Sequence, residues 1–120
     1  MGLDMYALTT CEQPETAYGF KAELADEIHR WRKHPNLHGW MEDLYFEKGG
    51  TEQFNCIALS LTAEDLDRLE ADVRAGNLPE TCGFFFGASD GSENEDDLAF
   101  IAKARAAIAE GRTVFYDSWW

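Results

Sequence analysis

The segment from Thr62 to Gly76 constrains the fold most, because it carries a start signal, an apolar stripe and a stop signal for one helix. Thr62 can accept a hydrogen bond from a first-turn N–H, and the acidic residues after it suit the positive end of the helix dipole. Gly76 is a good left-handed stop. The sequence therefore predicts a helix here with defined ends and a buried stripe of Leu66, Leu69 and Val73.

Both ends of the chain are predicted to form strands. Leu3 to Leu8 alternates between two faces, and Thr113 to Trp120 is rich in aromatic and β-branched residues. The segment Gln53 to Leu61 contains an apolar, β-prone run, and the Gly-flanked triple-Phe run from Cys82 to Gly87 is also typical of a strand.

Three further helices are predicted from apolar spacing. One runs from Phe20 to about Lys33, and Pro35 would end or kink it. A second stops before Gly49, and the third covers residues 96–111, where acidic residues at its start are favourable. The stripe of the first helix consists of Phe20, Leu24, Ile28 and Trp31.

These elements predict a single domain over residues 1–120. With 45% apolar residues and 13% aromatics, the chain has enough large side chains for one core. We expect the α+β class, with about four strands in one sheet packed against about four helices, because the chain is short and its terminal strands could pair. A small α/β sheet is the alternative.

The formal charge of −13 and an isoelectric point near 4.4 argue against direct binding to nucleic acid or to an anionic membrane. No apolar run approaches the roughly 18 residues of a membrane span, and the first residues lack the features of a signal peptide, so a cytoplasmic location is expected. Three widely spaced cysteines allow neither a disulfide framework nor a CxxC knuckle. Without a Walker loop, a dinucleotide fingerprint or a metal motif, we expect no cofactor and no metal.

The segment from His29 to Trp40 holds all three histidines and three of the ten basic residues. A cationic patch in so acidic a chain would attract an anionic ligand such as a phosphate or a carboxylate, with a tryptophan available for stacking. Alternatively, a helix would scatter these charges around its axis, where they would form a solvated face paired with nearby acids. Likewise, the acidic loop from Ser89 to Asp97 is expected to be solvated.

Pairing of the terminal strands would bring residues of both ends beside the region of His38. The candidate ligand-binding residues are Asp4, Tyr6, Arg32, Lys33, His38, Trp40 and Asp117.

Four motifs are spread over the whole chain: MGLDMY at the start, WRK followed by His38 and Trp40, GFFFG, and YDSWW at the end. With these motifs the chain resembles a family of small uncharacterised proteins of bacteria and their phages. The resemblance implies a cytoplasmic or prophage setting and no particular reaction. The positions that match the motifs are Asp4, Tyr6, Trp31, Arg32, Lys33, His38, Trp40, Asp117 and Trp119.

Three functions follow as hypotheses. The first is an acidic cytoplasmic binding domain, associated with a phage or prophage, that engages a protein or a small anionic ligand. The second is a hydrolase or transferase of a phosphorylated substrate, in which Arg32 and Lys33 hold the anion and His38 acts as acid or base near Asp4 or Asp117. The third is that the motif residues only stabilise the fold or a homodimer.

Overall fold

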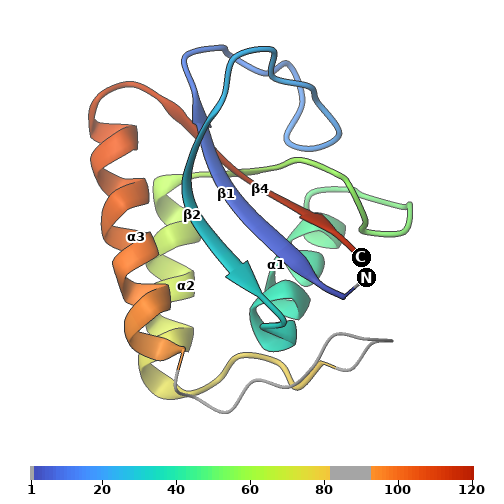
Figure 1. The fold of residues 1–120 in the computed structure, drawn as a ribbon, viewed down its shortest axis with the longest axis vertical. Coiled ribbons are helices and arrows are strands. Elements are labelled where there is room, and N and C mark those ends of the chain that lie inside the picture. Colours follow the sequence, from blue (N-terminus) through green and yellow to red (C-terminus); the bar gives the residue numbers. More distant parts are fainter. Residues whose placement is uncertain (1, 82–92) are drawn as a thin grey trace.

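A computed structural model describes residues 2–81 and 93–120. Over these residues, one four-stranded antiparallel sheet of order β2-β1-β4-β3 packs against three helices, all on the same face of the sheet (Figure 1). The α+β class is therefore confirmed, with three helices rather than four. The elements are β1 (Asp4–Thr10), β2 (Asp26–Arg32), α1 (Pro35–Glu47), β3 (Leu59–Leu61), α2 (Ala63–Ala75), α3 (Asn94–Ala109) and β4 (Thr113–Trp119).

The two terminal strands, β1 and β4, form the centre of the sheet. They pair without a register shift from Asp4, opposite Trp119, to Thr10, opposite Thr113. On its other side β1 pairs with β2, with an irregularity between Ala7 and Leu8. The expected pairing of the two ends is therefore confirmed, and it fixes which residues of β1 and β4 lie side by side.

The core lies between the sheet and the helices. Leu3, just before β1, and Met5 and Ala7 of β1 are fully buried on the helix side, and so are Val114 and Tyr116 of β4. The predicted stripe of α2 is fully buried as well. Complete burial of one Leu, Val or Phe side chain contributes roughly 1.5–3 kcal/mol, so this layer stabilises the fold.

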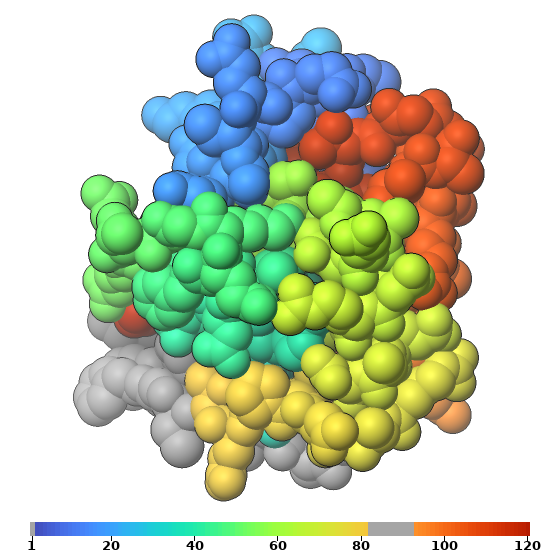
Figure 2. All heavy atoms as spheres, turned by 180° about the vertical axis from the view of Figure 1, so that it is seen from behind, coloured from blue at the N-terminus to red at the C-terminus, as the bar shows by residue number. Residues whose placement is uncertain are grey.

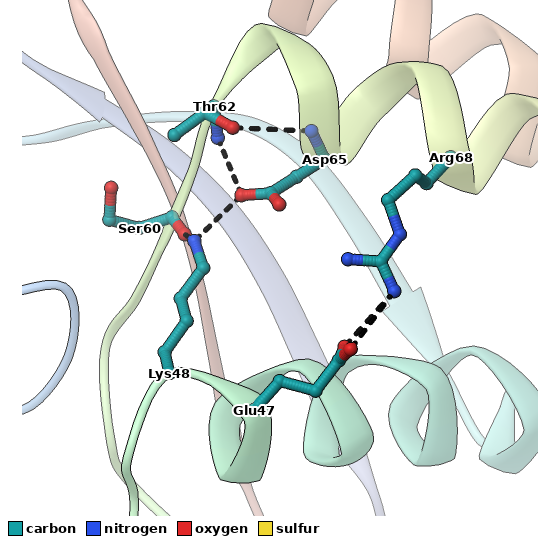
Figure 3. A network of polar contacts seen from close by, with 6 residues as sticks. All are labelled: Glu47, Lys48, Ser60, Thr62, Asp65 and Arg68. Atoms are coloured by element: carbon teal, nitrogen blue, oxygen red, sulfur yellow. Dashed lines mark hydrogen bonds and ion pairs between the residues drawn. The ribbon is translucent and has the colours of Figure 1, made fainter.

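A polar network fixes the start of α2 against the end of α1 (Figure 3). Thr62 Oγ1 accepts a hydrogen bond of 3.2 Å from the Asp65 N–H, and the Thr62 N–H donates to the Asp65 carboxylate at 2.9 Å. Lys48 Nζ, just after α1, donates to Asp65 Oδ2 and to the carbonyl of Ser60, each at 2.6 Å. The predicted cap at Thr62 is therefore confirmed, and Lys48 connects this cap to the end of α1.

The predicted helix from Phe20 to Lys33 is wrong, because residues 26–32 form strand β2. Pairing with β1 decides the conformation, since it satisfies the backbone groups of one side of β2 and buries Trp31 against the helices. Leu24, which the helical stripe placed in the core, is 82% exposed. Its spacing from Phe20 and Ile28 is therefore coincidental.

Two other boundaries differ from the expectation. The strand predicted from Gln53 to Leu61 is confirmed only at its end, because Cys56 has a left-handed φ of 59°, which interrupts an extended strand. The acidic segment is helical from Asn94 onward, and Asp97 is fully buried rather than solvated. The strand predicted at 82–87, and the acidic residues up to 92, lie outside the described residues.

The helix layer forms the back of the molecule, where α1 and α2 occupy the middle and residues 77–81 cross below them (Figure 2). Among the described helices, none is both long enough and apolar enough to cross a membrane.

Candidate functional site: the open face of the sheet

The face of the sheet that points away from the helices carries two rows of polar and aromatic side chains. Residues directly opposite each other on neighbouring strands share a face and interact. One row is Arg32, Asp4 and Trp119, taken from β2, β1 and β4. The neighbouring row is Arg30, Tyr6 and Asp117.

Within residues 2–81 and 93–120, the segment between β1 and β2 covers one end of this face. The segment between β1 and β2 is attached beside β3 by the hydrogen bonds from the Gly19 N–H to the Ala58 carbonyl and from the Ser60 N–H to the Ala17 carbonyl. From there it places Phe20 edge-on against Phe115, with ring centroids 5.2 Å apart, so that Phe115 is 4% exposed. The rest of this face, beyond the segment that covers Phe115, is named the open strip and consists of Asp4, Tyr6, Arg30, Arg32, Asp117 and Trp119.

The two arginines of the open strip are exposed and held by long ion pairs. Arg30 lies 4.9 Å from the centre of the Tyr6 ring, a cation–π distance, and 3.4 Å from the Glu27 carboxylate. The Arg32 Nε atom is 3.5 Å from Asp4. Charge-assisted hydrogen bonds are normally about 2.7–2.9 Å long, so these two contacts contribute little.

The other four arginines form shorter ion pairs. Arg68, Arg74, Arg105 and Arg112 each lie 2.7 to 3.0 Å from a carboxylate oxygen. The open strip thus presents two neighbouring guanidinium groups, each more than 60% exposed.

The conformation of β2 decides between the two interpretations of the basic segment. On a helix, Arg30 and Arg32 would point in different directions, but on a strand residues two apart share a face. Lys33 follows them at the end of β2 with a left-handed φ of 55°, and its N–H donates to the Leu3 carbonyl. Its side chain is exposed, and Lys33 therefore lies at the edge of the open strip.

Asp117 is half-buried between the aromatic residues of β4. Burial raises the pKa of its carboxyl, while a hydrogen bond from the Ser118 N–H, 2.8 Å long, acts in the opposite direction. The exposed Cys56 thiol also has a raised pKa, from burial first and then from the charge of Asp117. A raised thiol pKa means little thiolate at neutral pH, so Cys56 is not an activated nucleophile.

His38 does not belong to the open strip. It lies on α1, is 1% exposed, and stacks on Phe54 with ring centroids 5.3 Å apart. Its Nδ1 atom and the Tyr116 hydroxyl are hydrogen-bonded at 2.7 Å, and burial lowers the pKa of His38 to about 4. Because Tyr116 faces the helices while Asp117 faces the other way, the sheet separates His38 from the carboxylate that was expected beside it.

Trp40 also lies on the helix side. Its indole Nε1 donates to Asp72 of α2 at 2.8 Å, and the ring is largely buried. It lines a groove of about 330 Å³ between α1 and α2, together with Asp43, Glu47 and Arg68, on the face seen in Figure 2. Trp40 therefore joins two helices and does not contribute to the open strip.

The seven candidate residues thus divide into groups. Four of them, Asp4, Tyr6, Arg32 and Asp117, lie together on the open strip, Lys33 lies at its edge, and His38 and Trp40 lie in the helix layer. Sequence reasoning left Arg30 and Trp119 out of the set. The spacing of Arg30 and Arg32 would have indicated Arg30, had residues 26–32 been recognised as a strand, and the predicted strand at the end of the chain already placed Trp119 on the same face as Asp117.

A second polar cluster is buried where β2 meets the starts of α1 and α3. Asp97 accepts hydrogen bonds from the Trp31 indole at 3.0 Å and lies 2.9 Å from His34 Nε2. His29, mostly buried, lies 3.0 Å from the neighbouring carboxylate of Asp96. In the described part of the chain no three His, Cys, Asp or Glu side chains are arranged to hold a metal ion, and we regard this cluster as a structural junction.

Comparison of the chain with protein-family models, with curated proteins and with solved structures gave no match. The resemblance to a bacterial and phage family therefore stays a prediction.

Proposed function

We propose that this protein is a small binding domain that recognises an anionic group, on a protein or on a small ligand, through the open strip. The observation that carries the proposal is the pair Arg30 and Arg32, which lie side by side on the open strip with side chains more than 60% exposed. Guanidinium groups bind carboxylates and phosphates by paired hydrogen bonds. Because the chain carries a net charge of −13, an anion needs such local cations to offset the overall repulsion.

The aromatic side chains of the open strip support recognition rather than a solvated surface. Tyr6 lies under Arg30, and Trp119 is 64% exposed. Tryptophan, tyrosine and arginine are the residue types that dominate the binding energy of interfaces. We therefore expect the anionic group to be attached to a larger body that contacts these rings.

Binding is a better account than catalysis. The enzymatic hypothesis required His38 to act as acid or base beside Asp4 or Asp117. His38 instead lies in the core, on the far side of the sheet from both carboxylates. The cytoplasmic setting and the phage or prophage association remain part of the proposal, on the strength of the motif resemblance.

The proposal can be tested by nuclear magnetic resonance titration of the ¹⁵N-labelled protein with inorganic phosphate and with acetate, each against sodium chloride at equal ionic strength. We expect shift changes concentrated on β1, β2 and β4 around the open strip. The double substitution Arg30→Ala/Arg32→Ala should weaken the response about tenfold, which corresponds to one charge-assisted hydrogen bond of about 1.5 kcal/mol.

The matched control is Arg68→Ala/Arg74→Ala, which removes the same charge from exposed positions on α2. It should leave the titration of the open strip unchanged. Equal loss in both double variants would mean that only the net charge matters, and the proposal would then fail.

A further inference from the structure

The first row of the open strip presents three different chemistries in order across three neighbouring strands. Arg32 offers a guanidinium, Asp4 a carboxylate that accepts hydrogen bonds, and Trp119 an exposed indole. Neighbouring strands lie about 4.8 Å apart, so the outer two residues of the row are roughly 10 Å apart at the backbone. A ligand that satisfies the row needs an anion at one end, hydroxyl or amino donors in the middle and a planar ring at the other end.

The second row repeats part of this order. Arg30 lies beside Arg32 on β2, so an anion at this end meets two guanidinium groups. Asp117 lies beside Trp119 on β4, where its carboxylate would accept a hydrogen bond from an amino group on the edge of a stacked ring. Taken together, the two rows place two cations over β2 and, over β4, the Trp119 ring beside the Asp117 acceptor.

We propose, building on the proposed function, that the open strip binds a nucleoside monophosphate. Its phosphate lies against Arg30 and Arg32, its ribose hydroxyls donate to Asp4, and its base stacks on Trp119. Aromatic side chains on the open face of a sheet are a known way to stack bases, and each such contact is sequence-tolerant.

The charge of the protein favours a single nucleotide over a strand of nucleic acid. A polymer would extend beyond the open strip toward Glu27 and the other acids of a chain with a net charge of −13. Binding of nucleic acid strands depends on many Lys and Arg contacts to successive phosphates, and the open strip offers two.

The test is a nuclear magnetic resonance titration of the full chain with the four ribonucleoside 5′-monophosphates, compared with adenosine, ribose 5-phosphate and inorganic phosphate. A nucleotide should shift the Trp119 indole N–H together with the amides of β1, β2 and β4. It should bind about tenfold more tightly than ribose 5-phosphate, because base stacking contributes roughly 1–3 kcal/mol.

Substitutions at Trp119 and at the two arginines test the contacts of the base and of the phosphate separately. Trp119→Ala should weaken nucleotide binding about tenfold and leave the response to inorganic phosphate unchanged, while Trp119→Phe should restore part of the loss. Arg30→Ala/Arg32→Ala should weaken both responses. Phe46→Ala, at a half-exposed aromatic on α1, is the matched control and should change neither.

The outcomes are distinguishable. If nucleotides act no more strongly than ribose 5-phosphate while phosphate still shifts the open strip, the nucleotide is overturned and the proposed function stands. If no anion shifts the open strip, both are overturned. A single-stranded oligoadenylate of six nucleotides serves as a further probe, and tighter binding of this strand than of the monophosphates would overturn the single-nucleotide proposal in favour of nucleic acid.

Discussion

His38 and Tyr116 share a hydrogen bond of 2.7 Å inside the core, which joins α1 to β4. Burial lowers the pKa of His38 to about 4 and raises the pKa of Tyr116 well above its ordinary value. Both side chains are therefore neutral at pH 7, and the bond contains no charge. Protonation of His38 would place a charge at a side chain that is 1% exposed, which makes this contact sensitive to acid.

We expect acid to destabilise the protein through His38. The unfolded chain protonates this histidine near pH 6.5, whereas the folded protein does so near pH 4, so the free energy of unfolding decreases as the pH falls through this window. The contribution is at most ~3 kcal/mol. The measurement is urea unfolding from pH 7 to pH 4. The variant His38→Asn keeps a polar amide near the position of Nδ1 but does not titrate, so its free energy of unfolding should decrease less steeply. Identical slopes for both proteins would contradict the prediction.

Asp97 should be far more important for stability than its neighbour Asp96. Asp97 is fully buried and bonded to Trp31 and His34, so Asp97→Ala removes the acceptor from two buried nitrogen groups and should cost roughly 3–5 kcal/mol. Asp96→Ala removes a half-exposed carboxylate and should cost less than about 1 kcal/mol. Chemical denaturation of both variants checks this, and similar losses would mean that the buried cluster is not a structural junction.

Local signals made most of the fold predictable. The cap at Thr62 and the stop at Gly76 determine the ends of α2, and each forms its hydrogen bonds with residues at most four positions away along the chain. The alternation of Leu3, Met5 and Ala7 likewise reports the buried face of β1 directly. The pairing of β1 with β4 then followed from their positions at the two ends of a short chain.

Strand β2 was not predictable from local signals. Its conformation depends on pairing with β1, which is distant in sequence, and on the burial of Trp31 against α3. The same error left Arg30 out of the predicted site, since Arg30 and Arg32 share a face only in a strand. The position of His38 was not predictable either, because it depends on how α1 packs, and that packing is set by contacts such as those with Phe54 and Tyr116.

The two ion pairs in Figure 3 join the end of α1 to α2 but should differ in strength. Lys48→Met leaves the mostly buried carboxylate of Asp65 without its cation and should cost roughly 1–3 kcal/mol. Glu47→Ala breaks the pair with Arg68, in which both side chains are more than half exposed, and should cost less than about 1 kcal/mol. Thermal unfolding of the two variants measures the difference.

The network also predicts a specific pH dependence. Burial by itself raises the pKa of Asp65, but the hydrogen bonds from Lys48 and from the Thr62 N–H outweigh it, and the pKa is lowered overall. A carboxyl with a lowered pKa stabilises the fold above its unfolded pKa near 3.8, and this contribution is lost as the pH falls through the folded value. The stability difference between the wild type and Asp65→Asn should therefore shrink in acid, and a difference that is constant with pH would contradict this account.

The open strip should tolerate substitutions that the core does not. Trp119 is 64% exposed, so Trp119→Ala should change the free energy of unfolding by less than about 1 kcal/mol, whereas Trp31→Ala should cost roughly 3–5 kcal/mol. Urea unfolding measures both, and sedimentation at several concentrations detects any homodimer. A large loss of stability or a change of association state in Trp119→Ala would favour the structural hypothesis, because an exposed residue kept for ligand binding contributes to neither quantity.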